Sequence, residues 1–217
     1  RGIFATRGGY GSARVLRYLD WDTVAANPKV LIGHSDLTAL LTAVHQQTGL
    51  VTFWGPLAGY DLGRHPSKFK ARWLMRILCE PSPTLRFPRG VDNGRSRRWS
   101  NISSAPSASA ILTGGNLSLL ASLTGTPWEV ITEDRLLFIE DVDEEPYRMD
   151  RLLGQLDMSG KLQRAAGIVV GRCIGCEGTG RMKRTFSLRQ VLEQRLAGLG
   201  LPVIYGAPIG HEPDKIT

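Results

Sequence analysis

Ser35 stands where a short apolar run gives way to a helical pattern, in the stretch VLIGHSDLTALL. A serine hydroxyl becomes a good nucleophile only when a base removes its proton. A sharp turn, for which Gly33 supplies backbone freedom, would lift the hydroxyl above a sheet edge and present the next N–H to an oxyanion. The pattern resembles a nucleophile elbow but lacks G-x-S-x-G. Helix capping by Ser35 and Asp36 is the competing interpretation.

The base for such a serine would be a histidine, and the chain has four. His34 is adjacent to Ser35, and adjacent side chains diverge. His45 lies within the next helical pattern, and His65 lies in a proline-flanked loop. His211 follows an apolar run and a glycine, so a loop could carry it over the sheet edge. His211 is therefore the candidate base, with an ordinary surface histidine as the alternative.

A carboxylate must orient that histidine and stabilise its protonated form. Glu140 and Asp141 follow the apolar run LLFI, where a strand would present them at its end. The alternative for Glu140 is a structural ion pair with Arg148 or Arg151. The residues alone leave both alternatives open.

Two glycine-containing stretches could bring backbone N–H groups close to a substrate anion. They are RGGYG, from Arg7 to Gly11, and TGGN, from Thr113 to Asn116. A tight turn is the alternative at each. Neither is G-x-G-x-x-G, so a dinucleotide site is not supported.

The composition limits the class of protein. The 217 residues include 42% hydrophobic and 22% charged residues, which is typical of a globular protein. No apolar run approaches the roughly 20 residues of a membrane helix. The net charge of +7 is concentrated partly between Arg86 and Arg98, where proline, glycine and serine favour a solvated loop over a binding patch. No aromatic residues are interleaved there as a single-strand-binding platform would require.

The three cysteines, Cys79, Cys173 and Cys176, are too few for a disulfide framework and indicate a reducing compartment. Cys173 and Cys176 form a lone C-x-x-C without further ligands at zinc spacing. We interpret them as ordinary cysteines rather than a redox pair.

Alternation of apolar runs and helical patterns predicts a parallel, doubly wound α/β sheet. We expect strands at 2–6, 30–32, 52–56, 136–139, 167–171 and within 201–211, and a strand with a glycine turn and helix at 111–123. Further helices are expected at 15–19, 37–47, 66–78 and 186–199, and one beginning at Pro146. We place one domain at 1–80, a linker at 81–109 and a second domain at 110–217. Because the chain opens on Arg1 inside an apparent strand, we expect a fragment that lacks both ends.

The chain resembles the LD-carboxypeptidases, the murein tetrapeptide carboxypeptidases that are grouped with microcin-immunity serine peptidases. The resemblance runs from about Gly2 to His211 in the family's order. Its motifs are RGGYGSARVL, NPKVLIGHSDLTAL, FWGPL, GGNLSLLASLTGTP, LFIEDVDEEPYRMDRLLGQL, GIVVG and GAPIGH. Several are long, so together they are specific. The resemblance implies a Rossmann-like N-terminal α/β domain, a smaller β-rich mixed C-terminal domain, and a site between them.

The resemblance also implies roles for individual residues. The family's Ser-Glu-His triad falls on Ser35, Glu140 and His211. Its oxyanion donors fall on the N–H groups of Asp36 and Gly9. The substrate-binding residues are expected to be Arg7, Tyr10, Asn116 and Arg148, with Arg7 and Arg148 as partners for a terminal carboxylate. The sequence departs from the family at His34, where tyrosine or phenylalanine is usual, and at Trp54, where many members have histidine.

The expected activity is cleavage between the L-centre of a diamino acid and the terminal D-alanine of cytoplasmic peptidoglycan tetrapeptides. We expect neither a metal nor a cofactor, and neither nucleic acid nor a membrane as a partner. We expect the protein to form a homodimer. Two alternatives stay open. One is an immunity hydrolase that cleaves a toxic peptidyl-nucleotide, and the other is a non-catalytic binder of anionic cell-wall fragments. A nucleic-acid module, suggested only by the charge, lacks any recognised motif.

Overall fold

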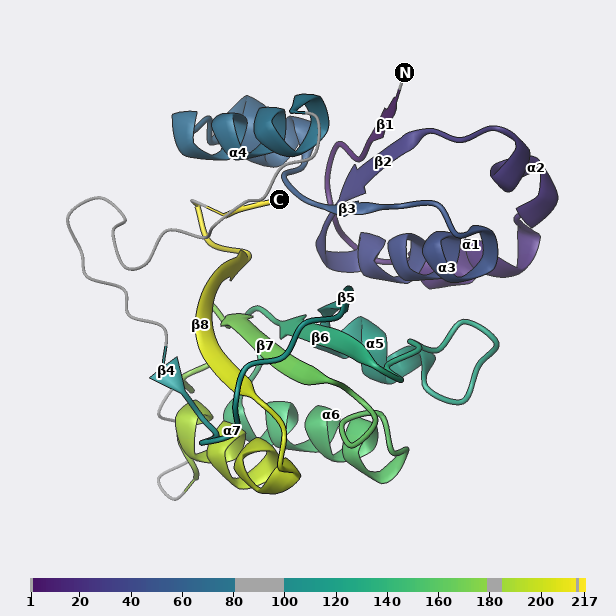
Figure 1. Ribbon diagram of the computed structural model, residues 1–217. Coiled ribbons are helices and arrows are strands. Elements are labelled where there is room, and N and C mark those ends of the chain that lie inside the picture. Colours follow the sequence, from purple (N-terminus) through teal and green to yellow (C-terminus); the bar gives the residue numbers. More distant parts are fainter. Residues whose placement is uncertain (1, 81–99, 179–184, 214) are drawn as a thin grey trace.

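The computed structural model describes residues 2–80, 100–178, 185–213 and 215–217. Most of the predicted linker and the basic stretch between Arg86 and Arg98 lie outside these ranges. The described chain forms two sheets, joined through the helix that follows Ser35 (Figure 1). The α/β class predicted from the alternation of elements is confirmed.

The first sheet is parallel and has the order β1-β2-β3. Its strands are β1 (Gly2–Phe4), β2 (Val30–Gly33) and β3 (Phe53–Trp54). The helices of this half are α1 (Ser12–Val15), α2 (Trp21–Ala26), α3 (Thr38–Thr48) and α4 (Lys68–Cys79). A 3₁₀ turn covers Leu16–Tyr18 and a π-helical turn covers Ala58–Arg64. The sequence missed α2, which begins at the side-chain cap of Asp20, and the π-helical turn.

The second sheet has the order β4-β8-β7-β6-β5. Its strands are β4 (Ser100–Asn101), β5 (Ile111–Asn116), β6 (Arg135–Glu140), β7 (Gly167–Arg172) and β8 (Val203–Gly210). All pair in parallel except β4, which is antiparallel to β8. Helices α5 (Leu117–Leu123), α6 (Pro146–Met158) and α7 (Leu188–Leu196) accompany it, with a 3₁₀ turn at Ala197–Leu199. As predicted, α6 begins at Pro146.

Two details of the predicted second domain change. β4 lies inside the stretch predicted as linker, because its backbone pairs with Ile204 and Tyr205 of β8. The predicted glycine turn of TGGN is part of strand β5: Gly114 and Gly115 pair with Phe138 and Ile139 of β6. The strand therefore runs directly into α5, and Asn116 caps that helix by accepting from the Leu119 N–H.

The hydrophobic core has two main parts. One lies between the second sheet and the helices α5, α6 and α7, and it includes Leu137, Leu153 and Leu192. The other combines residues of both sheets: Leu31, Leu41, Val44, Trp54, Trp73, Phe138, Ala207, Ile209 and Ile216. Because this second cluster is shared, the two halves pack against each other with α3 at their boundary. Within the described residues, no helix is long and apolar enough to cross a membrane.

Candidate active site

Ser35 occupies the turn between β2 and α3, and its backbone is left-handed with φ 62°. This region is uncommon for residues other than glycine and costs on the order of 1–3 kcal/mol. Gly33 was expected to provide the unusual conformation, but the positive φ falls on Ser35 itself. The turn begins a short 3₁₀ segment, Ser35–Leu37, that leads into α3. Such strain is typical of a nucleophile held on a sharp strand-to-helix turn.

The loop after β1 passes directly beside Ser35. A Cβ atom at Gly8 would lie 3.0 Å from the Ser35 Cβ and 3.2 Å from its Oγ. Only a glycine therefore permits this approach without displacing the serine. Gly8, rather than the predicted Gly9, is the loop glycine whose contact with Ser35 is seen, and the oxyanion role of the Gly9 N–H stays a prediction.

The Asp36 side chain is engaged away from the serine hydroxyl. Its Oδ2 accepts hydrogen bonds from the N–H of Ser12 at 2.9 Å and from the hydroxyl of Ser12 at 2.7 Å. These bonds connect the turn to the start of α1 and hold it in place. The predicted oxyanion donor at this position is the backbone N–H of Asp36, which the side-chain contacts leave unused.

Glu140 and His211 come together at the ends of β6 and β8. Nδ1 of His211 lies 2.7 Å from Oε2 of Glu140, which is completely buried. β7 lies between these strands, and a Cβ atom at Gly171 would lie 3.1 Å from the Glu140 Cβ and 2.3 Å from the Ile209 carbonyl oxygen. The missing side chain at Gly171 lets the carboxylate reach the histidine. Because an ionised carboxylate only accepts, Nδ1 carries the hydrogen and Nε2 is left as the basic nitrogen.

Asn116 holds Glu140 in place, and Asp141 in turn holds Asn116. The Asn116 Nδ2 donates to Glu140 Oε1 at 3.3 Å and to Asp141 Oδ1 at 2.8 Å. Asp141 Oδ2 accepts from the N–H and the hydroxyl of Ser118, so this carboxylate is occupied at the start of α5. Asn116, predicted as a substrate contact, is buried and here orients Glu140. Of the two strand-end carboxylates, the structure directs Glu140 to the histidine.

Ser35 and His211 line one cavity of about 560 Å³. Among the described residues that line it there is no acidic side chain, whereas Arg7 and Arg64 are present. The lining consists of Thr6, Arg7, Gly8, His34, Ser35, Leu57, Gly59, Tyr60, Arg64 and His211. A cavity with a hydroxyl, an imidazole and two guanidinium groups fits an anionic substrate with an electrophilic carbon.

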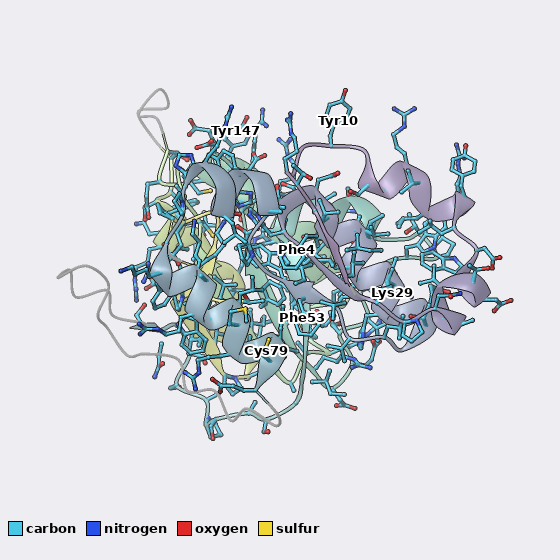
Figure 2. The ribbon with its side chains drawn as sticks, turned by 90° about the horizontal axis from the view of Figure 1, so that it is seen from above. Phe4, Tyr10, Lys29, Phe53, Cys79 and Tyr147 are labelled. Atoms are coloured by element: carbon cyan, nitrogen blue, oxygen red, sulfur yellow. The ribbon has the colours of Figure 1, made fainter. Side chains whose placement is uncertain are left out.

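Two predicted substrate contacts lie elsewhere. Arg148 lines a separate hollow with Tyr147 and Glu144, and its Nε donates to the Tyr147 hydroxyl. It does not line the cavity with Ser35, so in this structure Arg7 is the predicted carboxylate partner that does. Tyr10 is 92% exposed, and Figure 2 shows it projecting outward from its loop. Arg64, which the sequence analysis missed, lies in the π-helical turn and carries no motif that would have identified it.

The buried His34 side chain lies next to His211, and its backbone directly precedes Ser35. Its ring contacts the His211 ring edge-on, with centroids 5.0 Å apart, and the Trp54 ring at 5.1 Å. Its Nε2 lies 2.8 Å from Oδ2 of Asp61. Burial lowers the pKa of His34 to about 4, although the hydrogen bond to Asp61 opposes this. His34 is therefore neutral near pH 7, and Asp61 is a site residue that the sequence analysis missed.

Neither the cysteines nor other side chains form a metal site in the described part of the chain. No group of three or more His, Cys, Asp or Glu side chains there could hold a metal ion. Cys173 and Cys176 are buried free thiols. Hydrogen bonding between the two thiols and, next in size, burial raise the pKa of the Cys173 thiol. Such thiols are unreactive, which fits ordinary core cysteines.

The two halves of the chain match the two domains of the LD-carboxypeptidases. The family described as "LD-carboxypeptidase N-terminal domain" matches residues 1–55, and the one described as "LD-carboxypeptidase C-terminal domain" matches residues 109–217. These matches lie in the chain order that the motifs predicted.

Individual relatives agree with this match. A probable murein peptide carboxypeptidase of Bacillus subtilis (strain 168) is 40% identical over 220 residues, covering 97% of this chain and 64% of that protein. The crystal structure of muramoyltetrapeptide carboxypeptidase from Oxalobacter formigenes superposes with a TM-score of 0.81 at 31% identity, over 99% of this chain and 70% of that one. The microcin C7 self-immunity protein MccF of Escherichia coli is 29% identical over 244 residues, covering 99% of this chain and 67% of that protein. The chain thus spans about two thirds of these relatives.

Proposed function

This chain belongs to the LD-carboxypeptidase family, and from that premise we propose that the full-length protein is a serine carboxypeptidase acting on murein tetrapeptides. It removes the terminal D-alanine from the L-centre of the diamino acid, in the cytoplasm. The observation that carries the proposal is the shared cavity of Ser35 and His211, with Glu140 bonded to His211 at 2.7 Å.

In the proposed reaction, Nε2 of His211 takes the proton of the Ser35 hydroxyl as Oγ bonds to the carbonyl carbon. The N–H groups of Asp36 and Gly9 stabilise the oxyanion. His211 then gives its proton to the nitrogen of D-alanine, and the C–N bond breaks. Water, deprotonated by His211, hydrolyses the acyl-enzyme and regenerates the serine. Glu140 keeps the imidazole in the required tautomer throughout.

The substrate's terminal carboxylate is the group that Arg7 would bind. In the described part of the chain, no acidic residue lines the cavity to oppose this pairing. Tyr10, Asn116 and Arg148 were expected to bind substrate too, but the first and last are directed elsewhere and Asn116 orients Glu140. No metal or cofactor takes part in the proposed steps. The homodimer expected from the resemblance stays a prediction that sedimentation equilibrium would check.

The experiment compares D-alanine release by the full-length protein with that of its Ser35→Ala variant. The proposal expects release by the wild type and its loss in the variant, together with loss of labelling by a fluorophosphonate probe. Turnover retained in Ser35→Ala would remove the serine mechanism. A wild type that binds anionic cell-wall fragments in a salt-sensitive manner without labelling would favour the non-catalytic binder.

The second candidate function is that of an immunity hydrolase, favoured by the similarity to MccF. A panel that sets a murein tetrapeptide against an aminoacyl-sulfamoyl nucleoside separates the two functions. Preference for the tetrapeptide in kcat/KM supports the first function, and preference for the nucleoside supports the second.

A further inference from the structure

The three candidate triad residues belong to different halves of the molecule. Ser35 follows β2 of the first sheet, whereas Glu140 and His211 end β6 and β8 of the second. No strand pairing connects the two sheets in the described residues, so backbone hydrogen bonds of a sheet do not fix the position of Ser35 relative to His211. Side-chain contacts across the boundary must do so.

The segment after His211 returns to the first half. Figure 1 shows the end of the chain leaving β8 and lying beside α4 and β3. Ile216 is buried in the cluster that contains Leu31 and Trp54, and Thr217 packs against Gly55. Lys215 therefore enters the first half only four residues after the candidate base.

Lys215 makes a buried ion pair in that half. Its Nζ lies 2.8 Å from Oδ1 of Asp61 and 3.0 Å from Nε2 of His34. The three side chains are 1%, 3% and 2% exposed in the order Lys215, Asp61 and His34. Burial raises the pKa of Asp61, but hydrogen bonds from His34, Lys215 and the Leu57 N–H outweigh it and keep the carboxyl ionised. The Asp61 carboxylate thus faces the Lys215 ammonium at 2.8 Å and the Lys70 ammonium at 3.8 Å inside the protein.

Asp61 is itself held firmly. Its Oδ2 accepts the Leu57 N–H at 2.8 Å, and its carbonyl oxygen accepts from Nζ of Lys70 at 2.8 Å. Lys70 is also buried, from α4. The carboxylate is therefore a fixed anchor for whatever reaches it from the second half.

The Asp61–Lys215 pair is linked to both Ser35 and His211 through His34. His34 directly precedes Ser35, and its extended backbone enters the strained turn. Its ring meets the His211 ring edge-on and its Nε2 meets the Asp61–Lys215 pair. A shift of Lys215 or Asp61 would move His34, and through it both Ser35 and His211.

Buried ion pairs are a costly way to gain stability, because apolar side chains of similar size are often as stabilising or more so. What a buried pair adds is a defined geometry. A displacement of about 1 Å can lower a reaction rate about 100-fold, so geometry matters at this place.

We propose that the Asp61–Lys215 ion pair, with His34 as a shared partner, is a latch between the two halves that sets the position of Ser35 relative to His211. Asp61 and Lys215 are then positioning residues, not groups that touch the substrate. The inference rests on the proposed function for its reaction but adds residues that the triad does not contain.

The test uses the full-length protein with Lys215→Met, Asp61→Asn and the double variant. Either single change leaves an uncompensated buried group and is expected to lower folding stability. The double variant removes both charges of the pair together. Lys70, whose Nζ lies 3.8 Å from Oδ1 of Asp61, loses that carboxylate but keeps its hydrogen bonds to the carbonyl oxygens of residue 61 and His65, so the double variant is expected to fold. We expect kcat for D-alanine release to fall about 100-fold in the double variant with KM changed less than about threefold, which is the pattern of lost alignment.

Gln46 supplies the matched control, because it also joins the halves. On the last turns of α3, its Nε2 donates to the Glu129 carbonyl at 3.0 Å and its Oε1 accepts the Ile131 N–H at 3.0 Å. Gln46→Ala is expected to lower the melting temperature without lowering kcat. An equal loss of kcat in Gln46→Ala would show general loosening and overturn the latch.

A folded double variant with wild-type kcat would also overturn it. If the double variant does not fold, His34→Phe decides, because it keeps an aromatic ring beside His211 but cannot bind Asp61 or Lys215. A fall in kcat of about tenfold or more with unchanged KM is then expected, and wild-type kcat contradicts the latch. Turnover retained in Ser35→Ala would instead refute the proposed function, so the two failures are distinguishable.

Discussion

Oε2 of Glu140 and Nδ1 of His211 lie 2.7 Å apart although the residues are separated by 71 positions in the chain. The contact crosses the end of β7 at Gly171, where no side chain intervenes. It fixes which nitrogen of His211 carries the hydrogen, and hence which one is free to act on Ser35.

Replacing Glu140 with glutamine keeps the shape of the side chain but removes the charge that stabilises protonated His211. We expect kcat to fall by about 10³–10⁴-fold with little change in KM, as for the carboxylate of other serine triads. Steady-state kinetics of D-alanine release measure this. A loss of less than tenfold would show that the carboxylate does not serve His211.

The left-handed backbone at Ser35 makes a prediction about stability. Ser35→Ala keeps a side chain in this strained conformation, whereas Ser35→Gly relieves it. Both variants lack the nucleophile, so they form a matched pair. We expect the glycine variant to be more stable than the alanine variant by about 1 kcal/mol in urea denaturation. Equal stability would mean that the turn relaxes in solution.

A methyl group at Gly8 would press on the serine. Its Cβ would lie 3.0 Å from the Ser35 Cβ, so Gly8→Ala must displace one of them. We expect kcat to drop about 100-fold with the fold intact. Gly198→Ala is the control, since a Cβ atom there meets nothing within 4 Å. Wild-type kcat in Gly8→Ala would place the loop farther from the serine than described.

His34 predicts a pH dependence of stability. Burial lowers its pKa from 6.5 to about 4, so between these values the unfolded chain takes up a proton that the folded chain does not. The free energy of unfolding should therefore fall as the pH falls from about 6.5 to about 4. The full effect corresponds to roughly 3 kcal/mol.

The measurement is urea denaturation of the wild type and of His34→Phe across that range. The phenylalanine variant should lack this part of the pH dependence. The lowered pKa of Asp61 acts only below its ordinary value of 3.8 and does not enter the window. An identical slope in both proteins would show that His34 titrates normally.

Asp141 predicts a structural effect distinct from catalysis. In Asp141→Asn, one of the two carboxylate oxygens becomes an NH₂ group. In one orientation of the amide the Ser118 N–H and hydroxyl lose their acceptor, and in the other the Asn116 amide and the Val142 N–H lose theirs. We expect the free energy of unfolding to fall by about 2 kcal/mol. Glu133→Gln, which removes an exposed ion pair with Arg164, should cost at most about 1 kcal/mol and serves as control. Equal effects would mean that the Asp141 hydrogen bonds contribute little.

Local patterns in the sequence were sufficient for most elements. The apolar run at Val30 predicted β2, the helical spacing after Asp36 predicted α3, and Pro146 marked the first residue of α6. These succeeded because periodicity and proline geometry act within a few residues. Gly114 and Gly115 were misassigned to a turn because two adjacent glycines look the same in a turn and in a strand that must accept a close neighbour.

The candidate site divides in the same way. The sequence by itself offered Ser35 before a helix, Glu140 at a strand end and His211 after one as candidates, and the resemblance of its motifs to the LD-carboxypeptidases selected these three as the predicted triad. Only the tertiary structure decided that Arg148 lines a different hollow and that Asp61 and Lys215 meet behind His34. The physical reason is that the Asp61–Lys215 contact joins residues 154 positions apart. Burial and pairing at that range arise when two halves pack, and no local pattern of residue types records them.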